Sequence, residues 1–235
     1  MEKGSTFDPT MEICDNQVDD DKNGSIDCQD DDCKQRLDCR EAKPGSIDFF
    51  VMSQCPYAAK AMASVKELVA HFKGALAFGL HYVAWVYADY EYEKLPPAKQ
   101  GSCTAGDEGF HYCSLHGPAE VEEDLRQLCA IKYGTEGGKY LDYVLCRNEN
   151  VKSLDWKPCA AKAGLDKATI ETCSTTQEGL DLLKAEAALA TDLGITASPS
   201  FLINNTEIVS ISDRSATGIA SSVCSKNPGL SGCSP

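Results

Sequence analysis

The chain has 235 residues and a formal net charge of −14 at pH 7, with 36 acidic residues against 22 basic ones. So large a negative surplus argues against nucleic acid and against an anionic membrane surface as partners. No apolar run reaches the roughly 18 residues that a membrane-spanning helix needs, so we expect no membrane span.

Thirteen cysteines are spread along the chain and are not gathered in the paired clusters that bind zinc. This usage is typical of an oxidising compartment, in which most cysteines form disulfides. Because thirteen is an odd number, six disulfides leave one thiol free. The chain opens without a secretory signal peptide, so we expect a mature or trimmed protein, periplasmic or extracellular, whose full precursor could carry a lipid anchor.

Negative charge concentrates in residues 1–44, which hold 13 acidic and 6 basic residues and so a net charge of −7. This asymmetry predicts a separate acidic, cysteine-rich module at 1–44, ahead of a main domain at 45–235. A segment of this size buries little apolar surface, so disulfides and a metal ion would have to stabilise it.

Residues 19–30 follow the ligand spacing of a calcium loop of the EF-hand kind. Gly24 stands where such loops turn sharply, but Asp30 replaces the usual glutamate and neither flank shows an amphipathic helix. We therefore predict a structural Ca²⁺ site without an EF-hand, and no organic cofactor; the alternative is a solvated acidic linker. The expected ligands are side-chain or backbone oxygens of Asp19, Asp21, Asn23, Ser25, Asp27 and Asp30.

Four cysteines bracket this loop, and of their three possible pairings we favour Cys14 with Cys28 and Cys33 with Cys39. Residues 11–33 resemble the acidic, cysteine-bounded metal-binding repeats of surface proteins in myxobacteria and related bacteria. The resemblance implies a calcium-stabilised, extracytoplasmic module without catalysis.

The main domain has the pattern of an α/β unit. Residues 47–52 and 75–84 predict buried strands on either side of a helix at 56–72. A later strand near 195–203 leads through Asn204 and Asn205 into a short strand, which predicts a hairpin, and a last helix follows at 213–224. Between these halves lies an insertion at about 96–193, whose apolar spacing predicts helices.

Cys55 stands between the first strand and its helix, with Pro56 at the first helical position. Unpaired N–H groups and the positive end of the helix dipole favour thiolate over thiol at such a position. We therefore predict that Cys55 is the free thiol and a nucleophile.

The run Cys55-Pro56-Tyr57-Ala58, together with Ser198-Pro199 before a later strand, resembles the active site of the thioredoxin fold. The resemblance implies that the Ser198-Pro199 peptide bond is cis and faces Cys55. It also implies that the backbone of Ser198 pairs with an extended substrate.

The helical insertion resembles that of DsbA-like oxidoreductases, and the run from Cys113 to Glu120 is similar to the signature of gamma-interferon-inducible lysosomal thiol reductases. Residues that match the signature are His116, Gly117, Glu120 and Cys129. Three positions depart from it: Val121 replaces a cysteine, Asp124 replaces an asparagine, and Cys113 is one place out of register. His116, at a helix start beside the thiolate, could tune its charge and contact substrate.

The predicted function is extracytoplasmic thiol–disulfide exchange, as an oxidoreductase or isomerase, through the Cys55-Pro56-Tyr57-Ala58 motif. A thioredoxin-like enzyme normally resolves its mixed disulfide with a second cysteine, and that position is Ala58. Resolution would then need an external reductant, a partner thiol or the substrate's own thiol. Two interpretations of Ala58 stay open: a natural monothiol site, or a cysteine replaced by design. The substrate would be a protein or small-molecule thiol or disulfide.

Two other functions remain open. Met52, Cys55 and Met62 could supply soft sulfur to copper(I), or Cys55 could ligate an iron–sulfur cluster, although Met62 lies on the apolar stripe of its helix. Alternatively, the domain could bind or scaffold partners without turnover. Aromatic residues after the second strand could line a substrate groove or belong to the core: Tyr82, Trp85, Tyr87, Tyr90 and Tyr92.

The remaining cysteines are expected to be structural. We predict that Cys103 pairs with Cys113 and that Cys224 pairs with Cys233. Four further cysteines would crosslink the insertion in pairs that the sequence does not determine: Cys129, Cys146, Cys159 and Cys173.

Overall fold

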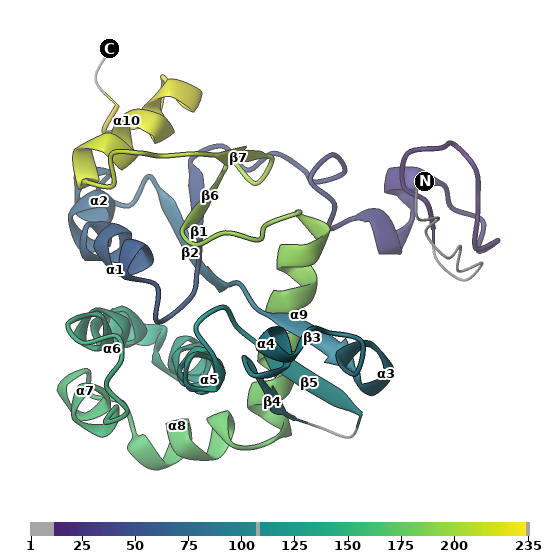
Figure 1. The fold of residues 1–235 in the computed structure, drawn as a ribbon. Coiled ribbons are helices and arrows are strands. Elements are labelled where there is room, and N and C mark those ends of the chain that lie inside the picture. Colours follow the sequence, from purple (N-terminus) through teal and green to yellow (C-terminus); the bar gives the residue numbers. More distant parts are fainter. Residues whose placement is uncertain (1–11, 107–108, 234–235) are drawn as a thin grey trace.

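The computed structural model describes residues 12–106 and 109–233, and a four-stranded sheet lies at the centre of the main domain (Figure 1). The strand order is β2-β1-β6-β7, in which β1 and β2 are parallel and the other neighbours are antiparallel. The strands are β1 Ser46–Val51, β2 Ala77–Tyr82, β6 Ser200–Ile203 and β7 Glu207–Val209. This is the mixed α/β arrangement that the sequence pattern predicts.

Helices flank this sheet (Figure 1), and residues of both the strands and the helices form the buried apolar core. Phe49 of β1 makes edge-to-face contacts with Phe78 of β2 and Phe201 of β6, at ring-centroid distances of 5.2 and 4.8 Å. The covering helices are α1 Pro56–Ala63, α2 Val65–His71 and α10 Ala216–Lys226, of which α2 packs against α10.

The single helix predicted for 56–72 is wrong in one respect, because Ser64 divides it into α1 and α2. The Ser64 N–H donates to the carbonyl of Ala61 at 3.1 Å, three residues back, and the Ser64 hydroxyl donates to the carbonyl of Arg214 at 2.9 Å. At Ser64 the regular α-helical hydrogen bond is therefore replaced by a tighter turn of the 3₁₀ type. The Ser64 side chain is hydrogen-bonded to the segment before α10.

The predicted hairpin is confirmed. Asn204, Asn205 and Thr206 join β6 to β7, and the two asparagines have φ angles of 54° and 66°. Both lie in the left-handed region, which asparagine tolerates better than most residues, and the Thr206 N–H closes the turn on the carbonyl of Ile203 at 3.3 Å.

A small second sheet, which the sequence pattern did not predict, joins the segment after β2 to the predicted insertion. Its strand order is β3-β5-β4, antiparallel throughout, with β3 Trp85–Ala88, β4 Cys103–Ala105 and β5 Phe110–Cys113. The helices of this region are α3 Asp89–Tyr92, α4 Pro97–Gln100, α5 Pro118–Gly134, α6 Lys139–Asn148, α7 Lys157–Lys162, α8 Lys167–Ser174 and α9 Gln177–Asp192. In Figure 1 this helical region lies below the main sheet, and α9 packs against β2 and β3.

The disulfides confirm two predicted pairs, Cys103–Cys113 and Cys224–Cys233. In the insertion, Cys129 pairs with Cys173 and Cys146 pairs with Cys159, so that α5 is bonded to α8 and α6 to α7. Cys55 is the free cysteine of the described residues.

Our favoured pairing in the N-terminal module is wrong. The disulfides are Cys14–Cys33 and Cys28–Cys39. Cys33 is fully buried beside Cys14, whereas Cys28 lies in a short 3₁₀ turn on the exposed side, facing the later Cys39. The Cys14–Cys33 disulfide, which closes the longer loop, therefore encloses the acidic loop and forms the buried centre of the module.

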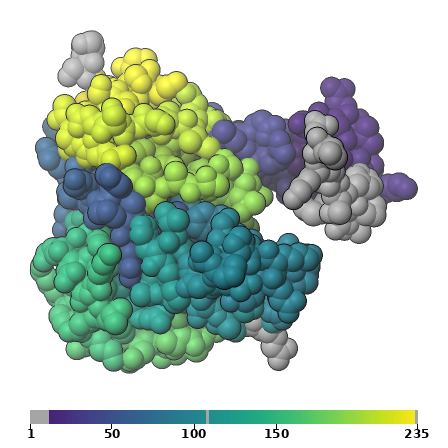
Figure 2. Space-filling model, in the orientation of Figure 1, coloured from purple at the N-terminus to yellow at the C-terminus, as the bar shows by residue number. Residues whose placement is uncertain are grey.

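This module, residues 12–44, projects from one side of the main body (Figure 2). It contains the 3₁₀ turns Asp27–Gln29 and Asp31–Cys33. Arg40 donates to the side-chain oxygen of Asn205, so the connecting segment contacts the β6–β7 turn. Among the helices of the described residues, none is both long and apolar enough to cross a membrane.

His81 of β2 connects the sheet to α9. Its ring stacks on Phe50 at 4.8 Å, its Nδ1 lies 3.1 Å from Oε2 of Glu186, and its Nε2 lies 3.8 Å from Oδ1 of Asp48. Burial disfavours the charged ring, but the hydrogen bonds and charges of Asp48 and Glu186 outweigh burial and raise the pKa of His81 to about 9.

We predict that His81→Gln lowers stability most below a pH of about 6.5. The folded-state pKa of His81 is raised to about 9 from an ordinary 6.5, so its stabilisation is fully present below the unfolded value and is lost as pH rises through about 9. Urea unfolding of the disulfide-intact proteins measures the free energy of unfolding of wild type and variant. The difference between the two should shrink by about a few kcal/mol as pH rises across this range.

The matched control is His71→Gln, because the His71 ring contacts the backbone carbonyl of Gly232 and not a carboxylate. A His81→Gln effect that stays constant from about pH 6 to about pH 9.5 would contradict the role given to Asp48 and Glu186.

Candidate active site

Cys55 lies at the junction of β1 and α1, where the sequence pattern placed it. It is the N-cap residue of α1, Pro56 is the first helical residue, and the Cys55 N–H donates to the carbonyl of Met52 at 3.0 Å. The Cys55 side chain faces the cis-proline segment, with Sγ at 3.3 Å from the carbonyl oxygen of Ser198. Only 5% of Cys55 is exposed, so the residue has little direct contact with solvent.

The Ser198-Pro199 peptide bond is cis, as predicted. The Ser198 hydroxyl accepts the N–H of Met52 at 2.8 Å. Two segments more than 140 residues apart in the sequence are thus held together by a side-chain hydrogen bond and by the contact at the thiol.

The other residues of the predicted motif differ in exposure. Tyr57 is 57% exposed, with the guanidinium of Arg214 5.5 Å from its ring centroid. Ala58 is buried, one turn along the helix from Cys55. Met52 and Met62 are both buried in the core, and neither group of potential metal ligands found in the described residues includes Cys55.

A buried carboxylate from α5 lies behind the loop that carries Cys55. Glu120 is fully buried, and its Oε1 accepts the N–H of Gln54 at 2.7 Å. Its Oε2 accepts the hydroxyl of Ser114 at 2.6 Å and the N–H of His116 at 3.0 Å. Glu120 therefore joins the Cys55 loop to the segment between β5 and α5.

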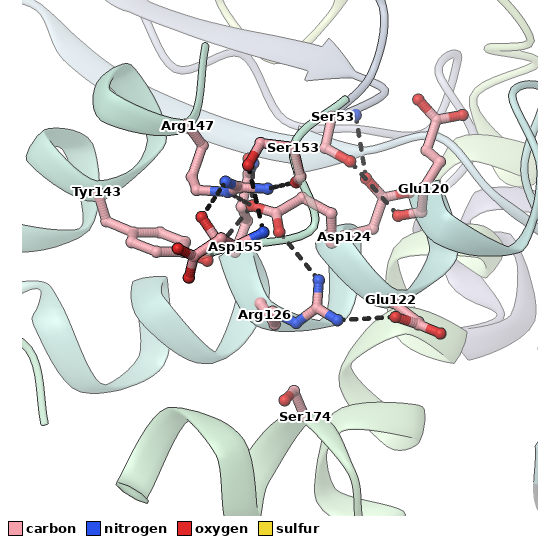
Figure 3. A network of polar contacts seen from close by, with 12 residues as sticks. Ser53, Glu120, Glu122, Asp124, Arg126, Tyr143, Arg147, Ser153, Asp155 and Ser174 are labelled. Atoms are coloured by element: carbon pink, nitrogen blue, oxygen red, sulfur yellow. Dashed lines mark hydrogen bonds and ion pairs between the residues drawn. The ribbon is translucent and has the colours of Figure 1, made fainter. Parts of the chain in front are cut away.

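Asp124, one turn further along α5, supports the same loop (Figure 3). Its Oδ1 accepts the N–H of Ser53 at 3.0 Å, and its Oδ2 is buried without a hydrogen-bond partner. Burial raises the pKa of Asp124 well above its ordinary value, and the neighbouring Glu120 raises it further, against the opposing effect of the bond from Ser53. Burial and the charge of Glu120 therefore disfavour the ionised form of Asp124 relative to a solvated carboxyl group.

A third acidic residue of α5, Glu123, is paired with a cation. Its Oε1 lies 2.8 Å from Nε of Arg147 and its Oε2 lies 3.1 Å from Nη1 of Arg126. Gln127 donates to Oε1 of Glu123 at 3.0 Å and accepts the hydroxyl of Tyr82 at 2.6 Å. Figure 3 shows the arginine side of this network, which links α5 and α6 directly behind the site.

His116 is placed beside the site, but its recorded partner is Glu120. The Nδ1 of His116 lies 2.9 Å from both carboxylate oxygens of Glu120. Glu120 thus connects His116 to the N–H of Gln54, the residue before Cys55.

The sequence pattern did not predict Ser53, Gln54 and Asp124 as parts of the site. Glu120 was noted only as a match to a family signature. The available signal was the pair of acidic residues four apart, Glu120 and Asp124, on one face of a helix whose apolar stripe includes Val121 and Leu125. Acidic residues on such a face are buried only where partners satisfy them.

The predicted metal ligands lie in the projecting N-terminal module. Asp21 and Asp30 gather with Asp32, and Asp19 and Asp21 gather with Glu12, each group having its ligand atoms within 4.8 Å of one another. The rest of the predicted set is placed differently: Asn23 donates its amide to Asp21 and Asp30, the Ser25 N–H bonds to Asn23, and Asp27 accepts the N–H of Asn16.

We predict that Asp124→Asn stabilises the protein increasingly as pH rises. The pKa of Asp124 is raised in the folded state. Below about pH 4 Asp124 is protonated in both the folded and the unfolded protein and causes no loss of stability. As pH rises from there toward the folded-state pKa, the unfolded protein ionises first and the free energy of unfolding falls. Asparagine keeps an acceptor for Ser53 and carries no charge. Each unit by which the folded-state pKa of Asp124 is raised corresponds to about 1.4 kcal/mol in the free energy of unfolding.

Urea titrations of both proteins between about pH 4 and pH 8 measure this effect. The matched control is Asp181→Asn on the exposed face of α9. A free-energy difference between Asp124→Asn and wild type that does not grow over this range would show that Asp124 is ionised in the folded protein.

Comparison with known proteins gives the same architecture. The structure is similar to oxidised BdbD from Bacillus subtilis, with a TM-score of 0.56 and 13% identity over 81% of this chain and 91% of that one. It is also similar to the thiol-disulfide exchange protein alpha-DsbA2 from Wolbachia pipientis, with a TM-score of 0.54 and 13% identity over 77% of this chain and 81% of that one.

A third similar structure is a probable DsbA oxidoreductase from Streptomyces coelicolor, with a TM-score of 0.52 and 16% identity over 77% of this chain and 88% of that one. At such identities these likenesses establish the thioredoxin-like fold. No curated protein matches the sequence.

The sequence itself matches one protein family, described as gamma interferon inducible lysosomal thiol reductase, over residues 46–163. This range begins at β1 and includes Cys55, the small second sheet and all of α5 and α6. The chain therefore belongs to the gamma interferon inducible lysosomal thiol reductase family, whose thioredoxin-like fold and thiol–disulfide chemistry agree with the site around Cys55.

Proposed function

We propose that this protein carries out thiol–disulfide exchange through a single nucleophilic cysteine, Cys55. The observation that supports this most directly is the position of the thiol, at the N-terminus of α1 and 3.3 Å from the backbone of the residue before the cis-proline. The other twelve cysteines are all paired. Cys55 is thus the sulfur available for attack without prior reduction.

In the proposed reaction, the Cys55 thiolate attacks one sulfur of a substrate disulfide. A bond forms between Cys55 Sγ and that sulfur, the substrate S–S bond breaks, and the other substrate sulfur leaves as a thiolate. The half-buried backbone at Ser198, whose carbonyl lies beside Sγ, would hold the substrate chain. Pro56, Tyr57 and Pro199 would shape the opening around the thiol.

The mixed disulfide then needs a second thiol. Ala58 occupies the position one turn along α1 and has no sulfur. An external thiol, or a second thiol of the substrate, would therefore attack the substrate sulfur of the mixed disulfide, form a new disulfide with it and release Cys55 as a thiolate. We propose the oxidising environment outside the cytoplasm as the place of action, because six disulfides would have to form and persist there.

We predict that wild type accumulates a stable mixed disulfide and that Ala58→Cys releases it. Incubation with a small neutral disulfide, bis(2-hydroxyethyl) disulfide, should add one mercaptoethanol to Cys55 by intact mass. In Ala58→Cys the neighbouring thiol attacks intramolecularly, so the adduct should decay at least about tenfold faster.

The control is Cys55→Ser, which should form no adduct at all. An adduct on another cysteine, or none in wild type between about pH 5 and pH 9, would contradict the proposed nucleophile.

We also propose that the N-terminal module binds Ca²⁺ structurally, through Asp19, Asp21 and Asp30 with Asn23. Asp30 is buried, and its Oδ2 accepts the amide of Asn23 at 2.6 Å. A buried carboxylate close to Asp21 and Asp32 suits a hard cation with oxygen ligands. Asp27 lies outside both of these groups, which weakens its candidacy as a direct ligand.

We predict that wild type binds Ca²⁺ with a Kd on the order of 0.1–1 mM, as extracellular modules do. Isothermal calorimetry on Asp30→Asn should show affinity reduced at least about tenfold, while Asp38→Asn, an exposed residue outside both groups, should bind like wild type. If wild type shows no heat of Ca²⁺ binding, the proposal is wrong and the N-terminal segment is a solvated acidic linker.

A further inference from the structure

A cavity of about 390 Å³ lies beside the cis-proline segment, in a region that exchange at Cys55 does not itself require. Its walls come from the small second sheet, α4 and the segment before α5. The lining side chains are Trp85, Tyr87, Leu95, Lys99, Ser102, Cys103, Cys113, Ser114, Leu115 and Thr196. A volume above about 300 Å³ is in the range of sites that hold organic groups.

The lining is mainly apolar. Trp85 and Tyr87 of β3 and the Cys103–Cys113 disulfide form one wall, and Leu95 and Leu115 complete it. The polar groups of the lining are partly committed elsewhere. The Ser102 hydroxyl donates to the carbonyl of Lys99 at 2.7 Å, and the Ser114 hydroxyl donates to Glu120 at 2.6 Å.

Two connections link residues of this cavity to the Cys55 site. Thr196 of the lining is two residues before Ser198, whose carbonyl contacts the Cys55 thiol. Ser114 of the lining shares Glu120 with Gln54, the residue before Cys55. An extended chain rises about 3.3 Å per residue. If an extended substrate peptide lies along the segment from Ser198 to Thr196 with its cysteine at Cys55, the side chain roughly two residues from that cysteine would reach the cavity.

One charge lies among the lining residues. Lys99 is exposed at the end of α4, whereas the chain as a whole has a net charge of −14. Leu115 is 67% exposed, so this apolar side chain of the lining is accessible to a ligand from solvent. An apolar group with a neighbouring carboxylate would match both features.

We propose that this cavity is a specificity subsite, which binds a large apolar side chain near the reacting cysteine of a peptide substrate, with an acidic group beside it on Lys99. The inference rests on the proposed exchange at Cys55 and adds the class of substrate. Burying a large side chain there would orient the substrate sulfur toward Cys55 and slow its departure.

The test uses four peptides whose cysteine is disulfide-bonded to 2-mercaptoethanol. Each peptide has phenylalanine or alanine two positions from the cysteine, and glutamate or glutamine at the next position. The two choices at each position give the four peptides. Attack by Cys55 on the peptide sulfur forms the Cys55–peptide disulfide and releases mercaptoethanol as a thiolate. We expect the second-order rate constant, followed by intact mass, to be at least about tenfold higher for phenylalanine than for alanine.

Two substitutions at exposed positions separate the contributions. Leu115→Asp should reduce the phenylalanine-to-alanine ratio severalfold, and Lys99→Glu should reverse the preference for glutamate over glutamine. The matched control is Leu154→Asp, another exposed leucine of the insertion that does not line the cavity. It should keep both ratios of wild type.

The outcomes distinguish this inference from the proposed function. Equal rate constants for all four peptides, in a wild type whose Cys55 reacts with bis(2-hydroxyethyl) disulfide, overturn the subsite and leave the exchange chemistry intact. Ratios that persist in Leu115→Asp and Lys99→Glu also overturn it, because the selectivity then originates elsewhere. A Cys55 that reacts with neither the peptides nor the small disulfide overturns both proposals.

Discussion

The site depends on where three consecutive backbone N–H groups find acceptors after β1 ends. Residues 52–54 are buried and have left the sheet, so their N–H groups need partners within the protein. The acceptors are three side chains from distant parts of the chain: Ser198 at 2.8 Å, Asp124 at 3.0 Å and Glu120 at 2.7 Å. Together they fix the loop immediately before Cys55.

This constraint makes the insertion part of the active site. Two of the three acceptors lie on α5, and α5 is bonded to α8 by the Cys129–Cys173 disulfide and to α6 by the ion pair of Glu123 with Arg147. A movement of α5 relative to the main sheet would leave buried N–H groups without partners. The crosslinks of the insertion therefore stabilise the loop at Cys55 as well as the helices that they join.

The sequence predicted the parts of this arrangement that depend on local patterns. Strand, helix and hairpin signals located β1, α1, β6 and β7, and the proline after Cys55 located the helix start. Ser198-Pro199 was placed opposite Cys55 by resemblance, and the cis peptide bond confirms it.

Patterns of this kind do not reveal contacts between distant segments. Asp124 looks like any acidic residue of a mixed helix, and its burial follows from α5 packing against the end of β1. The pairing of Cys14 with Cys33 likewise depends on how the acidic loop folds, which the spacing of cysteines alone does not fix. The second sheet was missed because β4 and β5 are only 3 and 4 residues long, too short for a periodic signal.

The absence of sulfur at position 58 gives the cavity beside Thr196 a particular importance. In a site with two cysteines, the second thiol ends the mixed disulfide quickly, so substrate binding has little time to influence the outcome. With Ala58, the mixed disulfide persists until another thiol attacks it, and noncovalent contacts can position a second thiol of the substrate against the substrate sulfur that is bonded to Cys55. A subsite that holds the substrate near its reacting cysteine would favour attack by the substrate's own second thiol, and the balance between isomerisation and reduction would then depend on residues such as Leu115 and Lys99.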